Sequence, residues 1–259
     1  MIEQPEDQRA GAEPGARRND EASWAKPVDR LSLPTAPAGA INLNVSGRKL
    51  IGPVQGFGPL WQKTYRIRLS VIATSAGAVV KIWKDNYPQF WPPGDRFYVP
   101  PHGIAPGEVG LINSRQVAGV DVATGVLVIY ADAESFTFMN AAGHPVAAMI
   151  TFSASDDAEG TAAQVQVLIR PSDPFYDLMF KFYGSPQEDR VWQHTLRALA
   201  AHLGATGDVE TTSVCIDRRR RWSEANNIWQ NAAIRSGFFM MSAPIRWLIR
   251  ASRTAAKRS

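Results

Sequence analysis

Four histidines and one cysteine are the side chains best suited to acid–base or nucleophilic chemistry in this 259-residue chain. His144 lies in the turn Gly143-His144-Pro145 and is the first acid–base candidate, because a turn at the rim of a sheet can face the mouth of a cavity. Arg68 is the second candidate, since an inward-pointing arginine can bind an acidic group on a ligand. The structural alternative is a surface turn for His144 and the wet face of a strand for Arg68.

Most catalytic and cofactor signatures are missing from the sequence. His194 and His202 are eight residues apart, which does not fit the HExxH spacing of a zinc-binding helix. No GxSxG, GxGxxG or P-loop motif occurs. Cys215 is the only cysteine, which excludes an intrachain disulfide, and its apolar context SVCID favours a buried thiol. We therefore expect no metal and no cofactor.

The composition is that of an ordinary globular protein, with 45% hydrophobic and 20% charged residues. The start MIEQPEDQRAG lacks the basic and apolar regions of a signal peptide. No uncharged apolar run reaches about 18 residues, the length that spans a bilayer. We expect a cytoplasmic protein, with peripheral attachment to the inner face of the membrane as an open alternative.

Strands are expected to fill most of the middle of the chain. Apolar and polar residues alternate over about 61–70, the period of a half-buried strand. A helix then begins after Ser75 and is ended by Pro88. Turn-separated strands are predicted at 96–100, 108–117, 125–131, 135–139, 146–154 and 163–170. This spacing predicts an antiparallel meander, in which the nearly all-apolar run 125–131 is buried on both faces.

The hydrophobic period changes from two to 3.6 after the last strand. Asp173 and Pro174 begin a short helix with one apolar face, namely Phe175, Leu178, Met179 and Phe182. The sequence Ser185-Pro186-Gln187-Glu188 indicates a capping box, in which Glu188 caps the next helix. That helix spans 186–203, is followed by Gly204 and has one apolar stripe: Trp192, Leu196, Leu199 and Leu203. The predicted fold class is α+β, a curved antiparallel sheet wrapped on this long C-terminal helix.

A long helix that crosses a curved sheet often leaves an apolar cavity between the two. The alternative is a solid core, and the sequence leaves both open. The side chains expected there, as core or as ligand-binding wall, are Tyr65, Ile67, Trp83, Phe136, Phe138, Ile150, Phe152, Val165, Val167, Trp192, Leu196 and Leu199.

Three segments carry a family resemblance: VLVIYADAESFTFMNAAGHP, ITFSASDDAEGTAAQVQVLIRPSDPF and the helix from Trp192 to Leu203. The stretch from about Trp61 to Gly204 resembles the helix-grip superfamily of START domains, plant pathogenesis-related allergens and polyketide cyclases (SRPBCC). Within it, the chain is most similar to one uncharacterised actinobacterial and plant family. The resemblance implies a pocket for a hydrophobic ligand, and it carries over no catalytic residue.

Three regions are predicted along the chain: a disordered leader at 1–40, a helix-grip domain with an irregular lead-in at 41–205, and a basic helical tail at 206–259. A tail helix is expected from Ser223 to a stop at Gly237. Residues 218–259 hold ten bases and one acid, so their net charge is +9. The tail residues expected to meet an anionic surface are Arg218, Arg219, Arg220, Arg221, Arg246, Trp247, Arg250, Arg253 and Lys257.

The first functional hypothesis is binding of an apolar small molecule or lipid between the sheet and the C-terminal helix. One alternative is an enzyme of the cyclase or hydratase type that acts on a polyketide-like or aromatic substrate. Another is a protein that interacts with an anionic membrane surface through its basic tail, although the tail could equally pack on the domain. Nucleic acid is the disfavoured partner, because no base-reading module surrounds the tail. Ligand identity and oligomeric state are left open by the sequence.

Overall fold

The computed structural model describes residues 20–33, 35–69, 74–115, 121–180 and 185–241. Within these residues the strands are β1 (Leu50–Ile51), β2 (Leu60–Arg68), β3 (Arg96–Tyr98), β4 (Val109–Arg115), β5 (Asp121–Ala131), β6 (Ser135–Ala141), β7 (Val146–Asp157), β8 (Gly160–Pro171) and β9 (Val209–Asp217). The α-helices are α1 (Ala76–Asn86), α2 (Pro174–Met179), α3 (Ser185–His202) and α4 (Ala232–Met241). Short 3-10 helices are η1 (Glu21–Ser23), η2 (Pro53–Gln55), η3 (Tyr87–Phe90) and η6 (Trp222–Gln230).

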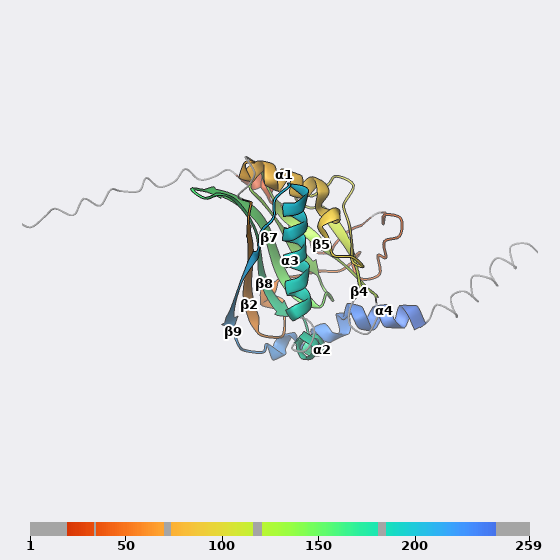
Figure 1. Cartoon of the computed structure of the whole chain (residues 1–259). Helices are drawn as coiled ribbons and strands as arrows, with labels where there is room; N and C mark the ends of the chain where they lie inside the picture. Colours follow the sequence, from red (N-terminus) through yellow and green to blue (C-terminus); the bar gives the residue numbers. More distant parts are fainter. Residues whose placement is uncertain (1–19, 34, 70–73, 116–120, 181–184, 242–259) are drawn as a thin grey trace, which may run out of the picture.

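In the described residues the strands form a single antiparallel sheet in the order β3-β4-β5-β6-β7-β8-β2-β9, with β1 paired to β6. Strands β3 to β7 are each paired with the strand that follows in the chain, so the predicted antiparallel meander is confirmed. The sheet is open and bent (Figure 1). The predicted α+β class is therefore confirmed.

The long helix α3 lies across the inner face of this sheet and contacts β2, β8 and β9 (Figure 1). Its apolar stripe faces inward, with Trp192, Leu196 and Leu199 all buried. Gly204 follows the helix with φ of +76°, a backbone conformation that glycine adopts without strain. The predicted grip of a curved sheet on a long C-terminal helix is confirmed.

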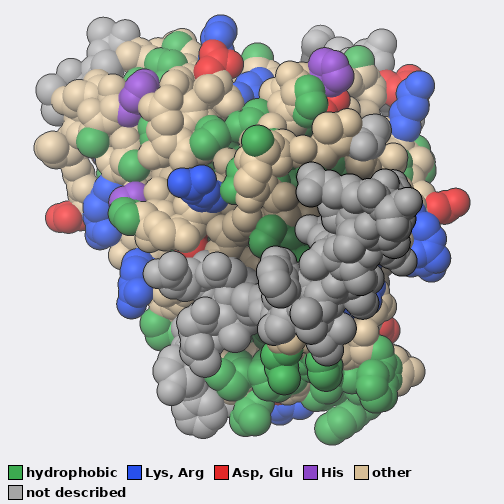
Figure 2. Space-filling view, turned by 90° about the vertical axis from the view of Figure 1, so that its right-hand side faces the viewer, with side chains coloured by type: hydrophobic (Ala, Val, Ile, Leu, Met, Phe, Trp, Pro, Cys, Tyr) green, Lys and Arg blue, Asp and Glu red, His purple; other side chains and the backbone are tan. Residues whose placement is uncertain are grey.

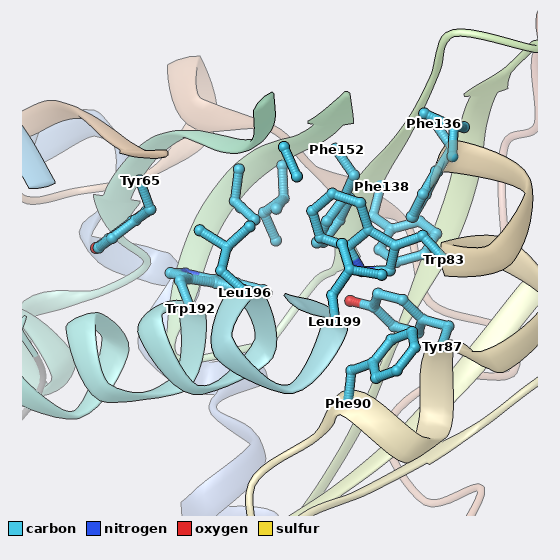
Figure 3. Close-up of a cluster of buried hydrophobic side chains, with 14 of the residues drawn as sticks. Tyr65, Trp83, Tyr87, Phe90, Phe136, Phe138, Phe152, Trp192, Leu196 and Leu199 are labelled. Atoms are coloured by element: carbon cyan, nitrogen blue, oxygen red, sulfur yellow. The ribbon is translucent and has the colours of Figure 1, made fainter. Parts of the chain in front are cut away.

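The core between helices and sheet is an aromatic cluster (Figure 3). The ring of Trp83 on α1 packs edge-on against Phe152, with 5.3 Å between ring centroids. Tyr87 packs edge-on against Phe138 at 5.4 Å. Helix α3 adds Leu196 and Leu199 to this cluster, as Figure 3 shows. Edge-to-face contacts of this kind are favourable beyond the apolar area that they bury.

The N-terminal segment covers the outer face of the sheet, so the expectation of a disordered leader is wrong for the described residues 20–33 and 35–40. Leu31 is only 3% exposed and packs with Leu127 of β5. The Ala25 amide donates to the Ile129 carbonyl at 2.9 Å, and Trp24 packs edge-on against Tyr130. The few apolar residues of this proline-rich segment suffice because β5 supplies the rest of the packing surface. Residues 1–19 lie outside the described residues.

The first part of the region 206–259, which the sequence predicted to be helical, forms strand β9. Strand β9 pairs with β2 and forms one edge of the sheet. A 3-10 helix, η6, then leads into α4, so the single helix predicted from Ser223 to Gly237 is wrong, and α4 runs through Gly237 to Met241. Cys215 is half-buried in β9 rather than deeply buried. The exposed edge position of β9 explains why its sequence, VETTSVCID, lacks a strong apolar face.

Helix α2 also differs from its predicted face. Phe175 and Leu178 are exposed, while Tyr176 and Asp177 are buried. The Asp177 carboxylate accepts from Nε of Arg220 at 2.7 Å, and the Tyr176 hydroxyl accepts from the Ala233 amide at 3.1 Å. Polar contacts with the chain after β9 therefore set the orientation of α2, and a pattern of apolar spacing does not report them.

Gly143 lies where the turn between β6 and β7 meets the junction of η6 and α4. Its φ is +97°, and its carbonyl accepts from the Ala232 amide at 2.9 Å. A β-carbon at this position would overlap the carbonyl oxygen of Gln230. This glycine is therefore required twice, once for its backbone angle and once for the close approach.

We expect Gly143→Ala to lower the free energy of unfolding by about 2 kcal/mol or more, because strain and overlap act together. Gly47→Ala is the matched control: Gly47 has φ of +78°, but an added β-carbon would meet no atom within 4 Å. We expect about 1 kcal/mol for this control, since it has the strain alone. Urea unfolding measures both, and equal losses would contradict the close approach.

Candidate functional site

A cavity of about 550 Å³ lies between the first half of α3 and the inner face of the sheet. Strands β4 to β8 supply its floor, and η3 with the residues after it closes one side. The residues that line it are Tyr87, Trp91, Asp95, Ile112, Ser114, Thr124, Val126, Phe138, Asn140, His144, Pro145, Val146, Ala148, Ile150, Val167, Ile169, Phe180, Pro186, Gln187, Glu188, Arg190, Val191 and Trp192. Pro186 and Arg190 are exposed, which places them at the rim.

The twelve side chains expected between sheet and helix divide into two groups. Four of them line the cavity: Phe138, Ile150, Val167 and Trp192. The other eight pack in the solid core: Tyr65, Ile67, Trp83, Phe136, Phe152, Val165, Leu196 and Leu199. The space under α3 is thus closed by side chains along its second half and open along its first half. The cavity and the solid core, which the sequence left as alternatives, are both present.

Sequence reasoning missed most of the polar groups on the cavity wall, among them Thr124 and Asn140. Asn140 follows Phe136 and Phe138 at a spacing of two, so all three share the inner face of β6. Thr124 lies on the inner face of β5, whose Val126 is paired with Asn140. A polar residue at an inward position of a strand, where the pattern is otherwise apolar, is the sequence feature that could have indicated Thr124 and Asn140.

His144, in the turn between β6 and β7, is among the residues that line the cavity wall. Its Nδ1 is 3.0 Å from Nδ2 of Asn140 and 3.2 Å from the Val146 amide nitrogen. The Val146 carbonyl oxygen also lies 3.2 Å from Nδ1. Because two N–H donors face Nδ1 against this one acceptor, we assign Nδ1 as the acceptor and place the proton of the neutral ring on Nε2. Burial lowers the pKa of His144 to about 4, against a weaker opposing effect of the Val146 backbone. The ring is therefore neutral at pH 7.

An ion cluster around the buried Lys63 side chain holds the start of α3. Nζ of Lys63, on the inner face of β2, donates to Oδ1 of Asp189 at 2.8 Å and lies 3.0 Å from Oε2 of Glu188. The Tyr65 hydroxyl donates to the same Asp189 oxygen at 2.6 Å. Burial raises the pKa of Glu188, and the Lys63 ammonium opposes this shift. The predicted capping role of Glu188 is thus replaced by a contact with Lys63, because its side chain turns inward to the cavity wall.

Arg68 does not face the cavity, so its interpretation as an inward ligand-binding group is wrong. Its guanidinium contacts Asp157 at 2.7 Å and Glu159 at 2.9 Å, at the hairpin between β7 and β8. The side chain alternates with Tyr65 and Ile67, whose side chains take the inner face of β2. The Arg68 guanidinium, together with the Glu159 amide, holds the pKa of Asp157 below its usual range.

The first arginines of the tail contact the domain itself. Arg220 is paired with Asp177, and the Arg219 carbonyl accepts from Arg170 at 3.1 Å. Arg221 donates to the Val54 carbonyl, while Arg218 is exposed. The remaining tail residues of the sequence prediction, Arg246, Trp247, Arg250, Arg253 and Lys257, lie outside the described residues.

No group of three or more His, Cys, Asp or Glu side chains in the described ranges is arranged to hold a metal ion. None of the helices in that part of the chain is long and apolar enough to cross a bilayer.

Comparison with solved structures finds similarities of fold. A START superfamily protein from Mycobacterium smegmatis is 20% identical, with 57% of this chain and 98% of that chain covered and a TM-score of 0.40. The protein Ara h 8.0201 is 12% identical, with 56% and 97% covered and a TM-score of 0.40. Human STARD10 is 12% identical, with 53% and 62% covered and a TM-score of 0.33. No protein-family model and no curated protein matches the chain.

The depressed pKa of His144 gives a pH dependence of known sign. The folded pKa of about 4 lies below the unfolded value of 6.5, so the unfolded chain binds the extra proton between these values. The contribution of His144 to the free energy of unfolding is therefore fully present above pH 6.5, and it is lost as the pH falls toward 4.

Between pH 7 and pH 5 we expect the wild type to lose about 2 kcal/mol through this residue. His144→Gln, which cannot titrate, should lack this loss, and urea unfolding of both proteins at the two pH values measures the difference. Identical losses in both would show that His144 ionises normally in the folded state.

Proposed function

We propose that this protein binds an apolar small molecule or lipid in the cavity between α3 and the inner face of the sheet. The observation that carries the proposal is the cavity itself, which is about 550 Å³ in volume and has a floor of largely aliphatic and aromatic side chains. Volumes of about 300–1,000 Å³ with a few polar groups on an apolar wall are typical of small-molecule sites.

The support is strongest where the wall is apolar on facing elements. Phe138, Ile150 and Val167 come from three neighbouring strands, and Val191 and Trp192 face them from α3. A ligand between these layers would have both of its faces removed from water. Burial of apolar surface contributes about 25 cal/mol per Å², which offsets part of the entropy that a ligand loses on binding.

The state of His144 favours binding over proton abstraction of the cyclase or hydratase type. Its Nδ1 already accepts from Asn140 and Val146, and its Nε2 holds the ring proton. Neither nitrogen then offers a lone pair to a substrate. Since Arg68 faces away from the cavity, neither of the two residues considered for catalysis offers a general base at this wall.

A second candidate function, contact with an anionic membrane surface, is favoured by one exposed surface. Trp229 on η6 is 82% exposed and Phe238 on α4 is 68% exposed. Trp222 on η6, Met241 on α4 and Phe175 on α2 are exposed as well. Hydrophobic side chains gather along the lower edge of the molecule, where α4 lies (Figures 1 and 2). We call Trp222, Trp229, Phe238 and Met241 the aromatic edge; Arg218 is exposed close to it in the chain.

This combination fits the interface of a bilayer. Aromatic rings insert at the headgroup level, and each nearby arginine contributes about 1 kcal/mol of attraction to anionic lipid. The arginines that the sequence analysis assigned to the membrane are partly engaged with Asp177 and with backbone carbonyls. The support for this candidate therefore comes mainly from the aromatic edge.

Ala148→Phe is the sharpest test of the cavity. Ala148 is fully buried on the cavity floor beside Ile169, so a phenyl ring would occupy the space of the ligand. We expect uptake of the neutral apolar dye N-phenyl-1-naphthylamine, followed by fluorescence, to fall by about tenfold or more while the thermal midpoint is retained.

Leu199→Ala is the control, because Leu199 packs in the solid core and does not line the cavity. It should lower the free energy of unfolding by about 2–5 kcal/mol but leave dye uptake by the folded protein unchanged. Undiminished uptake by Ala148→Phe would contradict the proposed site.

For the membrane candidate, the double change Trp229→Ser with Phe238→Ser should lower sedimentation with vesicles containing phosphatidylserine by about tenfold, since two exposed rings are lost. The control is Val214→Ser with Ile216→Ser, which removes two exposed apolar side chains from β9 instead. Equal sedimentation of wild type and both variants would exclude the aromatic edge as the contact.

A further inference from the structure

The side-chain amide of Asn140, on the cavity wall, has hydrogen-bond partners for its nitrogen but none for its oxygen among the described residues. Nδ2 of Asn140 donates to the Val146 carbonyl at 2.8 Å and to Nδ1 of His144 at 3.0 Å, which uses both of its hydrogens. Its Oδ1 is buried and has no hydrogen-bond partner among the residues that the structure describes. Rotating the amide would place Oδ1 against the Val146 carbonyl, so the orientation is fixed.

A buried hydrogen-bond acceptor that receives no hydrogen bond destabilises the folded protein. Asn140 is fully buried, and it lines the cavity. A ligand in the cavity is therefore the natural source of the missing donor.

His144 supplies the complementary group. Because its Nδ1 accepts from Asn140 and from the Val146 amide, its Nε2 presents an N–H. Oδ1 of Asn140 and Nε2–H of His144 thus belong to two side chains in direct contact on one wall. Thr124, on the neighbouring strand, adds a hydroxyl that also has no partner within the described ranges. Together they offer one acceptor, one donor and one group that can be either.

The charged groups on the wall disfavour an anionic ligand. Glu188 is held by Lys63, and Asp95 accepts from the Ser114 hydroxyl at 2.7 Å. Of the described residues that line the cavity, only Arg190 is a cation at pH 7, and it is exposed at the rim. A carboxylate deep in the cavity would meet Oδ1 of Asn140 and find no cation beside it.

We propose, resting on the proposed cavity binding, that the ligand is an uncharged apolar molecule with a hydroxyl group. The hydroxyl donates to Oδ1 of Asn140 and accepts from Nε2–H of His144. A hydroxyl carries both capacities on one atom, as this pair requires, whereas a carboxylate only accepts and a hydrocarbon does neither. Asn140, His144 and Thr124 are then the residues that set specificity, and the apolar floor supplies affinity.

The test is displacement of N-phenyl-1-naphthylamine from the full chain at pH 7.5 by three probes of equal chain length: 1-decanol, decanoate and decane. We expect 1-decanol to displace the dye at about tenfold lower concentration than either of the others, the effect of one well-formed buried hydrogen bond. Asn140→Leu keeps the branched shape of the side chain and removes both of its hydrogen-bonding groups, so the variant should bind the dye and lose the preference for the alcohol.

Asn113→Leu is the matched control, because the Asn113 amide donates to Gly39 outside the cavity wall and the preference should be unchanged. Equal displacement by 1-decanol and decanoate on the wild type, or a preference that survives in Asn140→Leu, would overturn the inference and leave cavity binding intact. Failure of all three probes and the dye to bind would overturn the proposed function instead. The comparison of probes on the wild type needs no variant to fold.

Discussion

The fixed position of a straight helix across a bent sheet is the constraint on which the rest of this structure depends. A rigid α3 can follow the curvature of the sheet along only part of its length. Along its second half, Leu196 and Leu199 contact the aromatic cluster directly, and no space remains. Along its first half the helix is separated from the inner face of the sheet, and the cavity of about 550 Å³ lies between the two. The site is thus a consequence of how the layers pack.

The two halves of α3 are held by different kinds of interaction. Apolar contact alone would favour a first half that closes onto the sheet, because collapse buries more surface. Lys63 instead holds Glu188 and Asp189 at fixed distances from β2. A buried ion pair is a poor source of net stability, but it is specific in geometry, since removing one partner leaves an uncompensated charge. The cluster therefore sets the height of the helix above the cavity.

Much of the fold can be predicted from the hydrophobic periodicity of single segments. The elements that could not be predicted depend on contacts with distant parts of the chain. The alternation in β2, β7 and β8 and the stripe on α3 are visible because each element buries one whole face. Strand β9 and the segment 20–40 bury little surface of their own, and they are ordered by β2 and β5. Lys63 and Asn140 broke the apolar pattern at inward positions, which is the mark of a functional position. Their partners come from distant segments, so spacing alone could not assign their roles.

One turn joins the cavity to the outer surface. Gly143 accepts from Ala232 at the start of α4, and the next residue, His144, lies on the cavity wall. Asn44 strengthens the joint, since its amide bonds to the Ala123 carbonyl of β5 and to Ser236 of α4. Because the aromatic edge is carried on η6 and α4, it is joined to the turn that carries His144 through the hydrogen bond between Ala232 and Gly143. The surface proposed to meet a membrane and the wall proposed to recognise a hydroxyl are therefore neighbours in the fold.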